Sequence, residues 1–162
     1  MVDSLTKEKR SWNMAQVKSK NTKPERLVRA LLHAAGFRFT VNGPKNKQLP
    51  GKPDIVLPKY RTVVFVHGCF WHRHPGCKAT RTPKSNQDFW EAKFARNVAR
   101  DQRDVADLTA AGWAVVVVWE CELKHPETLL AKLKTRLLKT PSSLTYEEPA
   151  ERYLTAAESA DD

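Results

Sequence analysis

Residues 113–119 read Trp113-Ala-Val-Val-Val-Val-Trp119, a nearly continuous run of β-branched side chains preceded by Gly112. Such a run is typical of a strand buried on both faces, because apolar residues do not alternate with polar ones. Two shorter runs come earlier, Asp54-Ile-Val-Leu57 and Thr62-Val-Val-Phe-Val66, and the turn Pro58-Lys-Tyr-Arg61 between them indicates a β-hairpin. We therefore expect a central sheet built from these three runs.

Helical patterns surround these strands. Thr22 is a suitable N-cap and Pro24 suits a first turn, so they predict the start of a helix that Gly36 ends. The other expected elements are a short helix at 11–18, a strand at 37–41, a loop at 42–52, a long helix at about 85–111 and a helix at 126–139. The resulting order α, β, β, β, α, β, α predicts an α/β domain with a mixed sheet and helices on its faces.

Length and charge limit the classes of protein to which the chain can belong. A chain of 162 residues with 41% hydrophobic residues is expected to form one domain with one core. We expect that domain to cover residues 1–146, with a helical arm over about residues 1–21. No run is long enough to span a membrane and the first ten residues are polar, which favours a cytoplasmic protein.

The charge is unevenly distributed. The formal net charge is +10, but residues 147–162 hold six acids against Arg152, a net −5 that leaves +15 on residues 1–146. We expect residues 147–162 to be a flexible acidic tail. A body this basic favours a polyanionic partner, nucleic acid first of all, although a well-solvated basic surface is the alternative.

All three cysteines belong to one pattern, Cys69-x4-His74-x2-Cys77 with Cys121 just after the long strand. Zinc prefers four thiolate or imidazole ligands in a tetrahedron, which leaves no open position, so the site would be structural and would tie the loop to the sheet. The alternative is that Cys121 is an ordinary buried thiol and the other two are loop residues. An odd cysteine count without a secretory signal argues against a disulfide framework.

A carboxylate and two imidazoles follow the ends of neighbouring strands. Asp54 starts one strand, and the paired strand leads to His67 and then His72. Phosphodiester cleavage needs magnesium on hard oxygen ligands and a base for the attacking water, and His72 is free to be that base if His74 completes the zinc site. The alternatives are a turn carboxylate at Asp54 and a zinc ligand at His72. From spacing alone, Glu25 is accounted for by the capping box that it forms with Thr22.

Aromatic side chains lie within the same segment. Phe70 and Trp71 could stack on bases or insert between base pairs, or they could fill the core. On the long helix, one stripe carries Trp90, Lys93, Asn97 and Asp101, whereas Phe89, Phe94, Val98, Val105 and Leu108 are expected to face the sheet. The mixed stripe predicts either a binding surface or a solvent-exposed face.

Five motifs together resemble the very short patch repair (Vsr) DNA mismatch endonucleases. They are Leu49-Pro-Gly-Lys-Pro-Asp54, His67-Gly-Cys-Phe-Trp-His72, Phe89-Trp90, Asn97-Val-x-Arg-Asp101 and Trp119-Glu-Cys121, and the resemblance covers roughly residues 8–140. It implies a restriction-endonuclease-like fold with a mixed central sheet, a structural zinc and a catalytic magnesium. It also implies a cytoplasmic, nucleoid-associated bacterial enzyme that nicks one DNA strand beside a T:G mismatch left by deamination of 5-methylcytosine.

The resemblance implies a role for each matched residue. Asp54 would bind magnesium with the backbone carbonyl of Val66, His72 would be the general base and Asp101 the carboxylate that orients it. Glu25 and His67 would act around the metal through water, which revises the capping interpretation of Glu25. The zinc ligands would be Cys69, His74, Cys77 and Cys121, the intercalating wedge would be Phe70, Trp71 and Trp90, and the contacts to the mismatched pair would come from Met14, Lys93 and Asn97.

Two stretches depart from that family. Where many restriction-type nucleases have an acid, a spacer and a lysine, this chain has Val66-His-Gly68, and Arg73 with Pro75-Gly76 replaces a stretch that is richer in histidine. The expected partner is mismatched double-stranded DNA, with other mismatch-repair proteins as further partners and a monomer as the working unit. The alternatives are a non-catalytic zinc-stabilised DNA-binding module and a restriction-like nuclease with another target.

Overall fold

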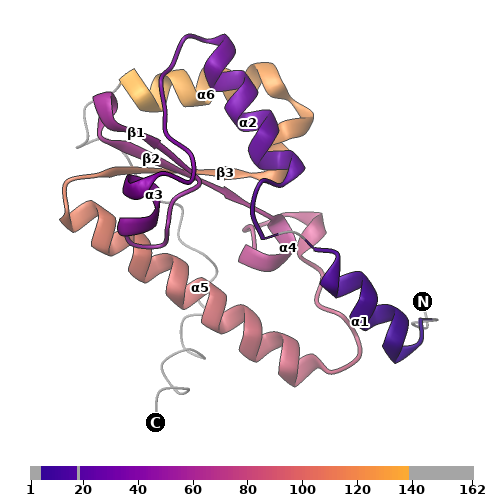
Figure 1. Cartoon of the computed structure of the whole chain (residues 1–162). Coiled ribbons are helices and arrows are strands. Elements are labelled where there is room, and N and C mark those ends of the chain that lie inside the picture. The colour runs from indigo at the N-terminus through magenta and orange to yellow at the C-terminus, as the bar shows by residue number, and fades with distance from the viewer. Residues whose placement is uncertain (1–4, 18, 139–162) are drawn as a thin grey trace.

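A computed structural model of the chain describes residues 5–17 and 19–138 (Figure 1). The expected acidic tail, residues 147–162, lies outside the described residues, as do the last residue of the short helix expected at 11–18 and that of the helix expected at 126–139. The helices and strands are α1 Lys7–Ala15, α2 Lys23–Ala34, α3 Pro44–Gln48, β1 Ile55–Leu57, β2 Thr62–His67, α4 Cys69–His72, α5 Gln87–Ala110, β3 Ala114–Trp119 and α6 Pro126–Leu138. Short 3-10 turns, η1 Pro58–Tyr60, η2 Lys78–Thr80 and η3 Glu120–Lys124, connect some of them.

The sheet is mixed and has three strands in the order β1-β2-β3. β1 pairs antiparallel with β2 across the turn η1, with Ile55 opposite Val64, which confirms the hairpin. β3 pairs parallel with β2 along its whole length, so His67 lies opposite Trp119. The carboxyl ends of β2 and β3 therefore meet at one edge of the sheet, next to α4.

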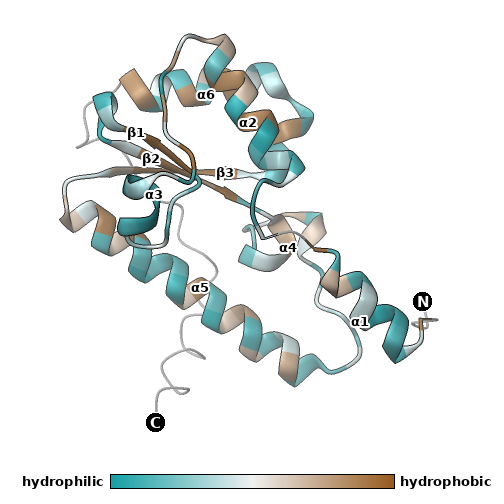
Figure 2. Ribbon diagram, viewed as in Figure 1, coloured by the Kyte–Doolittle hydropathy of each residue, from teal (hydrophilic) through white to brown (hydrophobic). Residues whose placement is uncertain are grey.

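Helices cover both faces of the sheet, as the element order predicted. In Figure 1, α2 and α6 lie on one face and α3 and α5 on the other, and Figure 2 shows the strands between them as the most hydrophobic part. Val64, Val116 and Val118 pack against Leu32 of α2 and Leu133 of α6. The other face belongs to a second cluster, in which Val56, Val63, Phe65 and Val115 pack with Leu108 of α5. Alternate residues of each strand thus pack into two different hydrophobic clusters, one on each face of the sheet, which is why β3 has no polar face.

The strand expected at residues 37–41 is wrong. Only Thr40 pairs with the sheet, through an isolated bridge in which its N–H donates to the Val56 carbonyl at 2.8 Å. The ladder stops because Asn42 has a left-handed φ of 55° and turns the chain away, while at the other end Pro58, which would face Arg38, has no N–H to donate. The expected loop at 42–52 holds the short helix α3, whose Asn46 amide donates to the Thr40 and Pro53 carbonyls.

The expectation for the apolar residues of α5 is correct for one half of the helix only. Leu108 and Val105 pack on the sheet, but Phe94 and Val98 form a separate cluster with Phe70 and Trp90. Phe89, also expected against the sheet, is 55% exposed. The physical reason is length, since α5 extends past the end of the sheet and its amino-terminal half lies beside α4 instead (Figure 1).

Helix α1 lies at the edge of the molecule, beyond α4 (Figure 1), and every one of its residues is exposed. It begins four residues earlier than the pattern at 11–18 predicts, because the Thr6 hydroxyl accepts a hydrogen bond from Lys9 N–H and caps it. Helix α2 begins after the predicted cap Thr22. None of the helices in residues 5–17 and 19–138 is both long and apolar enough to cross a membrane.

Candidate active site and metal sites

The sheet positions Asp54 beside the end of β2. Asp54 directly precedes β1, and its carboxylate Oδ2 accepts a hydrogen bond from the Val66 N–H at 2.8 Å, so the side chain is held against the neighbouring strand. The carboxylate lines a cavity of about 510 Å³ at this edge of the sheet. The same cavity is lined by five further residues predicted from the sequence, namely Glu25, Val66, His67, His72 and Asp101.

His72 and Asp101 form a short polar contact at this cavity. The single turn α4 ends at His72, and its Nδ1 lies 2.6 Å from Oδ2 of Asp101, a buried residue of α5. A carboxylate is only an acceptor, so it keeps the proton on Nδ1 and leaves the lone pair on Nε2. The arrangement fixes both the tautomer and the ring orientation that a base requires.

The ring of His67 is stacked on that of His72, with centroids 3.8 Å apart and the planes 6° from parallel. His67 is buried, and burial together with the neighbouring His72 and Arg100 lowers its pKa well below the usual value. His67, His72 and Asp101 have donor atoms within 4.8 Å of one another. Nevertheless, the lone pairs of two stacked rings lie in parallel planes and do not meet at one point, which argues against one ion held by both histidines.

Glu25 both caps α2 and lines the cavity. Its carboxylate Oε2 accepts the Asn21 N–H at 2.8 Å, while its own N–H donates to the Thr22 hydroxyl at 3.4 Å. The same buried side chain thus caps α2 and lines the cavity that holds Asp54. One oxygen of the carboxylate serves the cap, and the residue still contributes negative charge to the cavity.

The donor set around Asp54 suits a hard divalent cation. Burial raises the pKa of Asp54 to about 6, the Val66 N–H lowers it and the nearby Glu25 raises it. Carboxylates that are buried close together in this way are stabilised by a cation, and oxygen ligands are those that magnesium prefers. Asp54 and Glu25 therefore fit a magnesium site by their chemistry.

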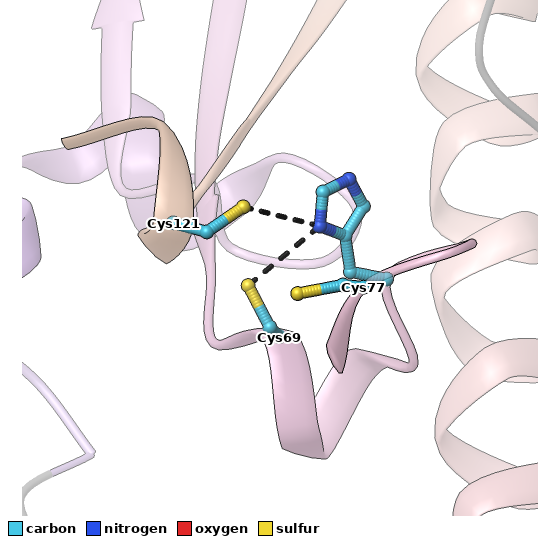
Figure 3. Close-up of side chains that lie close together, drawn as sticks. Cys69, Cys77 and Cys121 are labelled. Carbon is cyan, nitrogen blue, oxygen red and sulfur yellow. Dashed lines mark hydrogen bonds between the residues drawn. The ribbon is translucent and has the colours of Figure 1, made fainter. Parts of the chain in front are cut away.

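The second candidate metal site is the cysteine and histidine cluster. Cys69, His74, Cys77 and Cys121 have ligand atoms that all lie within 4.8 Å of one another (Figure 3). Nδ1 of His74 is 3.7 Å from Sγ of Cys69 and 3.3 Å from Sγ of Cys121. Bond lengths of 2.3 Å to sulfur and 2.0–2.1 Å to nitrogen give a nitrogen–sulfur edge of about 3.6 Å in a zinc tetrahedron. The residues therefore fit a four-ligand zinc site.

The surroundings of this cluster hold two of its ligands in place. The His74 ring stacks on Trp119, with centroids 4.3 Å apart. Next to Cys121, the Glu122 carboxylate accepts the Trp119 N–H at 2.8 Å and pairs with Lys132 of α6 at 2.6 Å. In the absence of a metal, burial and the neighbouring thiols raise the pKa of Cys69 to about 12 and raise that of Cys121. A bound cation would reverse this by stabilising the thiolates.

The aromatic residues form one continuous cluster between α4 and α5. Phe70 contacts Trp71 and Trp90, with ring centroids 5.0 and 5.6 Å apart, and the rings of Trp71 and Trp90 are 5.9 Å apart. All three are half-buried, so both sequence interpretations, core filling and an accessible surface, describe part of each side chain.

The mixed stripe of α5 faces α4 rather than open solvent. The Lys93 ammonium lies 5.1 Å from the ring centroid of Trp71, and the Asn97 amide donates to the Trp71 carbonyl at 3.1 Å. Lys93, Trp71 and His72 also line a groove of about 890 Å³, which Met14 of α1 lines from the other side. The structure thus brings Met14 and Lys93 to one groove with the candidate base His72. Asn97 does not line this groove but donates a hydrogen bond to the backbone of Trp71, which does.

Sequence reasoning missed several residues of this region. Lys52, Arg100 and Asp104 line the cavity that holds Asp54. Helical spacing could have indicated Asp104, three residues after Asp101, and Arg100 stands in the motif Asn97-Val-x-Arg-Asp101, to which no role was assigned at that position. Arg73 is buried, with its guanidinium 4.0 Å from the Phe94 ring centroid and a hydrogen bond of 3.1 Å to the Thr82 hydroxyl.

Comparison with known proteins places this chain among DNA-cleaving enzymes. The family model for DNA mismatch endonuclease Vsr matches residues 2–78. A type II nicking enzyme of Xanthomonas oryzae pv. oryzae, V.XorIIP, is 53% identical over 137 residues, which is 85% of this chain and 98% of that protein. The nicking enzyme V.NmeAIP of Neisseria meningitidis is 51% identical over 125 residues, 77% of this chain and 86% of its own. DNA mismatch endonuclease Vsr of Escherichia coli is 40% identical over 139 residues, 86% of each chain.

Proposed function

Because the chain belongs to the family of Vsr DNA mismatch endonucleases and is therefore a hydrolytic nuclease that acts on DNA, we propose that it nicks one strand of a duplex beside a T:G mismatch in a magnesium-dependent reaction. The mismatch, left by deamination of 5-methylcytosine, is the substrate that the sequence motifs imply. The observation that carries the proposal is the His72–Asp101 pair beside Asp54 in one cavity.

The base in this proposal is Nε2 of His72. Water placed in the cavity transfers a proton to this nitrogen as its oxygen attacks phosphorus, and His72 becomes an imidazolium. The bond between phosphorus and the leaving sugar oxygen breaks, and that oxygen takes a proton from solvent. Asp101 keeps the opposite ring nitrogen protonated and stabilises that positive charge across the 2.6 Å hydrogen bond. His67, which is buried and stacked on His72, limits the movement of the base.

Asp54 and the backbone carbonyl of Val66 would hold magnesium, with Glu25 and His67 acting on it through water. The ion, when bound, supplies charge stabilisation for the phosphate and a lowered pKa for the attacking water. Val66 is suited to this because the N–H and C=O of one strand residue point to the same side, so the carbonyl faces the side on which the N–H binds Asp54. A bound cation would favour the ionised form of the Asp54 carboxylate.

Zinc is the metal that we propose for Cys69, His74, Cys77 and Cys121. These ligands come from α4, from the loop after it and from η3 at the end of β3, so the ion would tie the loop that carries His72 to the sheet. Four protein ligands leave no position for substrate, which makes the role structural.

We propose a restriction-endonuclease-like fold for the domain, residues 1–146, with an arm over about 1–21.

The groove between α1 and α4 is the proposed DNA site. Phe70, Trp71 and Trp90 would insert next to the mismatch, where half-buried rings can exchange protein contacts for stacking on bases. Met14, Lys93 and Asn97 would contact the mismatched pair. The net charge of +10 supports binding of the chain to the phosphate backbone of DNA. We propose that the protein acts as a monomer.

The proposal is tested by offering the purified protein and magnesium a T:G duplex and the matched T:A duplex in varied sequence contexts. The expected result is one nick on the T strand of the mismatched duplex and a rate at least about 10²-fold lower on the matched one. Equal cutting of both would point to a nuclease with another target. Binding without cutting in any context would point to a DNA-binding module.

A further inference from the structure

Arg100 is placed where the DNA groove meets the catalytic cavity. It lines both the cavity that holds Asp54 and the groove that holds Trp71 and Lys93. Its side chain is 55% exposed and lies 3.9 Å from the Asp101 carboxylate, the length of a loose ion pair rather than of a hydrogen bond. The guanidinium therefore keeps its donors available for a ligand.

The catalytic cavity is poor in positive charge for a site that must accept a phosphodiester. Four carboxylates line it, those of Glu25, Asp54, Asp101 and Asp104. The described residues that line it include only two permanent cations, Lys52 and Arg100. The end of β2 offers Val66 and His67 at the position nearest to Asp54, and neither carries a permanent charge.

The two cations differ in where they can reach. Lys52 lies on the loop before Asp54 and lines the cavity but not the groove, whereas Arg100 lines both the cavity and the groove from which DNA would enter. A planar guanidinium can donate two parallel hydrogen bonds to the non-bridging oxygens of one phosphate, which an ammonium cannot do. Hydrolysis of the phosphodiester increases the charge on these oxygens, so such donors stabilise the transition state more than the bound substrate.

We propose that Arg100 is a further catalytic residue that binds the non-bridging oxygens of the phosphate being cleaved, where the groove opens into the cavity that holds Asp54. The proposal rests on the nuclease function proposed above. It assigns to α5 two tasks, since Asp101 orients the base and the residue before it holds the substrate. Adjacent helix positions point about 100° apart, which lets one side chain face His72 and the other face the groove.

The test compares Arg100→Gln and Arg100→Lys with Arg103→Gln, a matched control that removes an exposed arginine from the next turn of α5. Single-turnover nicking of the T:G duplex is measured with saturating protein and magnesium. We expect Arg100→Gln to be about 10²-fold slower, Arg100→Lys to recover part of the rate, and Arg103→Gln to stay within about threefold of wild type. The pH profile should keep its shape in Arg100→Gln, because the base is untouched.

A second measurement locates the contact chemically. Phosphorothioate duplexes carry sulfur at one or the other non-bridging position of the cleaved phosphate, and a guanidinium binds sulfur less well than oxygen. One diastereomer should be cut slowly by the wild type, should not be rescued by manganese, and should lose this sensitivity in Arg100→Gln.

Several outcomes overturn the assignment. One is a rate for Arg100→Gln equal to that of Arg103→Gln, and another is an unchanged sulfur effect. A shifted pH profile would make Arg100 a residue that acts through His72. If the wild type itself cuts none of the duplexes, the proposed function fails and not this assignment alone.

Discussion

The hydrogen bond between His72 and Asp101 should increase the nicking rate by about 10³-fold. As His72 takes a proton from water, a positive charge forms next to the Asp101 carboxylate, with 2.6 Å between the bonded atoms. Two unit charges whose centres are about 4 Å apart interact by about 4 kcal/mol at an effective dielectric constant of 20. Asp101→Asn keeps the shape and a neutral acceptor but removes the charge, and 1.36 kcal/mol corresponds to tenfold in rate, so we expect a loss of about 10³-fold.

The assay is single-turnover nicking of a labelled T:G duplex with saturating protein, so that the chemical step and not product release is measured. Asp107→Asn is the matched control, because it removes an exposed carboxylate from the same helix. DNA affinity and melting temperature should stay close to those of the wild type for both variants. Since Asp101 acts through His72, combining Asp101→Asn with His72→Ala should be no slower than His72→Ala alone.

A rate for Asp101→Asn within about threefold of the wild type, with normal DNA binding, would refute the assignment of His72 and Asp101 as a base and its orienting carboxylate. Additive losses in the double variant would refute it as well, because independent groups and not a pair would then contribute to the rate.

Three further perturbations test other parts of the site. Cys121→Ser should remove about one zinc ion per chain and lower the melting temperature by roughly 10 °C or more, as measured by metal analysis and thermal unfolding; a metal-free wild type that is equally stable would contradict the zinc site. The pKa of Asp54 is raised to about 6, so without magnesium the folded chain keeps a proton that the unfolded chain loses from about pH 4. Its contribution to stability is therefore lost as pH rises from about 4 through 6, and Asp54→Asn should stabilise the magnesium-free protein by about 1.4 kcal/mol more at pH 8 than at pH 5, because about one unit of the pKa shift lies above pH 5; equal melting shifts at both pH values would disprove this. Gly51→Ala should destabilise by about 1–3 kcal/mol in denaturant titrations, because φ is +71° and the new Cβ would lie 2.8 Å from Asp104 Oδ2; an unchanged midpoint would show that the loop is not constrained there.

Three strands, and several of the residues that line the cavity with Asp54, could be predicted because strong local signals mark them. Uninterrupted β-branched runs have few alternatives to a buried strand, and the residues that follow such strands must lie at the same edge of the sheet. Asp54, His67 and His72 were therefore found from their position along the chain. The cysteines were found because zinc ligands are restricted in type and number, and a single cluster uses all three.

Features that depend on how distant segments pack could not be predicted. The alternation at residues 37–41 indicates a strand, but the turn at Asn42 and the missing N–H of Pro58 limit pairing to one bridge. Periodicity placed Phe89 on the apolar face of its helix. It could not predict that α5 extends past the end of the sheet at that point, which leaves Phe89 exposed. In the same way, the stacking of His67 on His72 and the position of Arg100 arise from the meeting of β2, α4 and α5, which local sequence does not encode.

The central claim is that the chain cleaves DNA at a metal centre on Asp54. The most direct test is the nicking rate of the T:G duplex as a function of magnesium concentration, for the wild type and for Asp54→Asn, at protein concentrations that saturate the DNA. We predict that the wild type nicks the T strand only when magnesium is present, and that Asp54→Asn binds the same duplex but leaves it intact at every magnesium concentration. Nicking by Asp54→Asn at the rate of the wild type would contradict the claim.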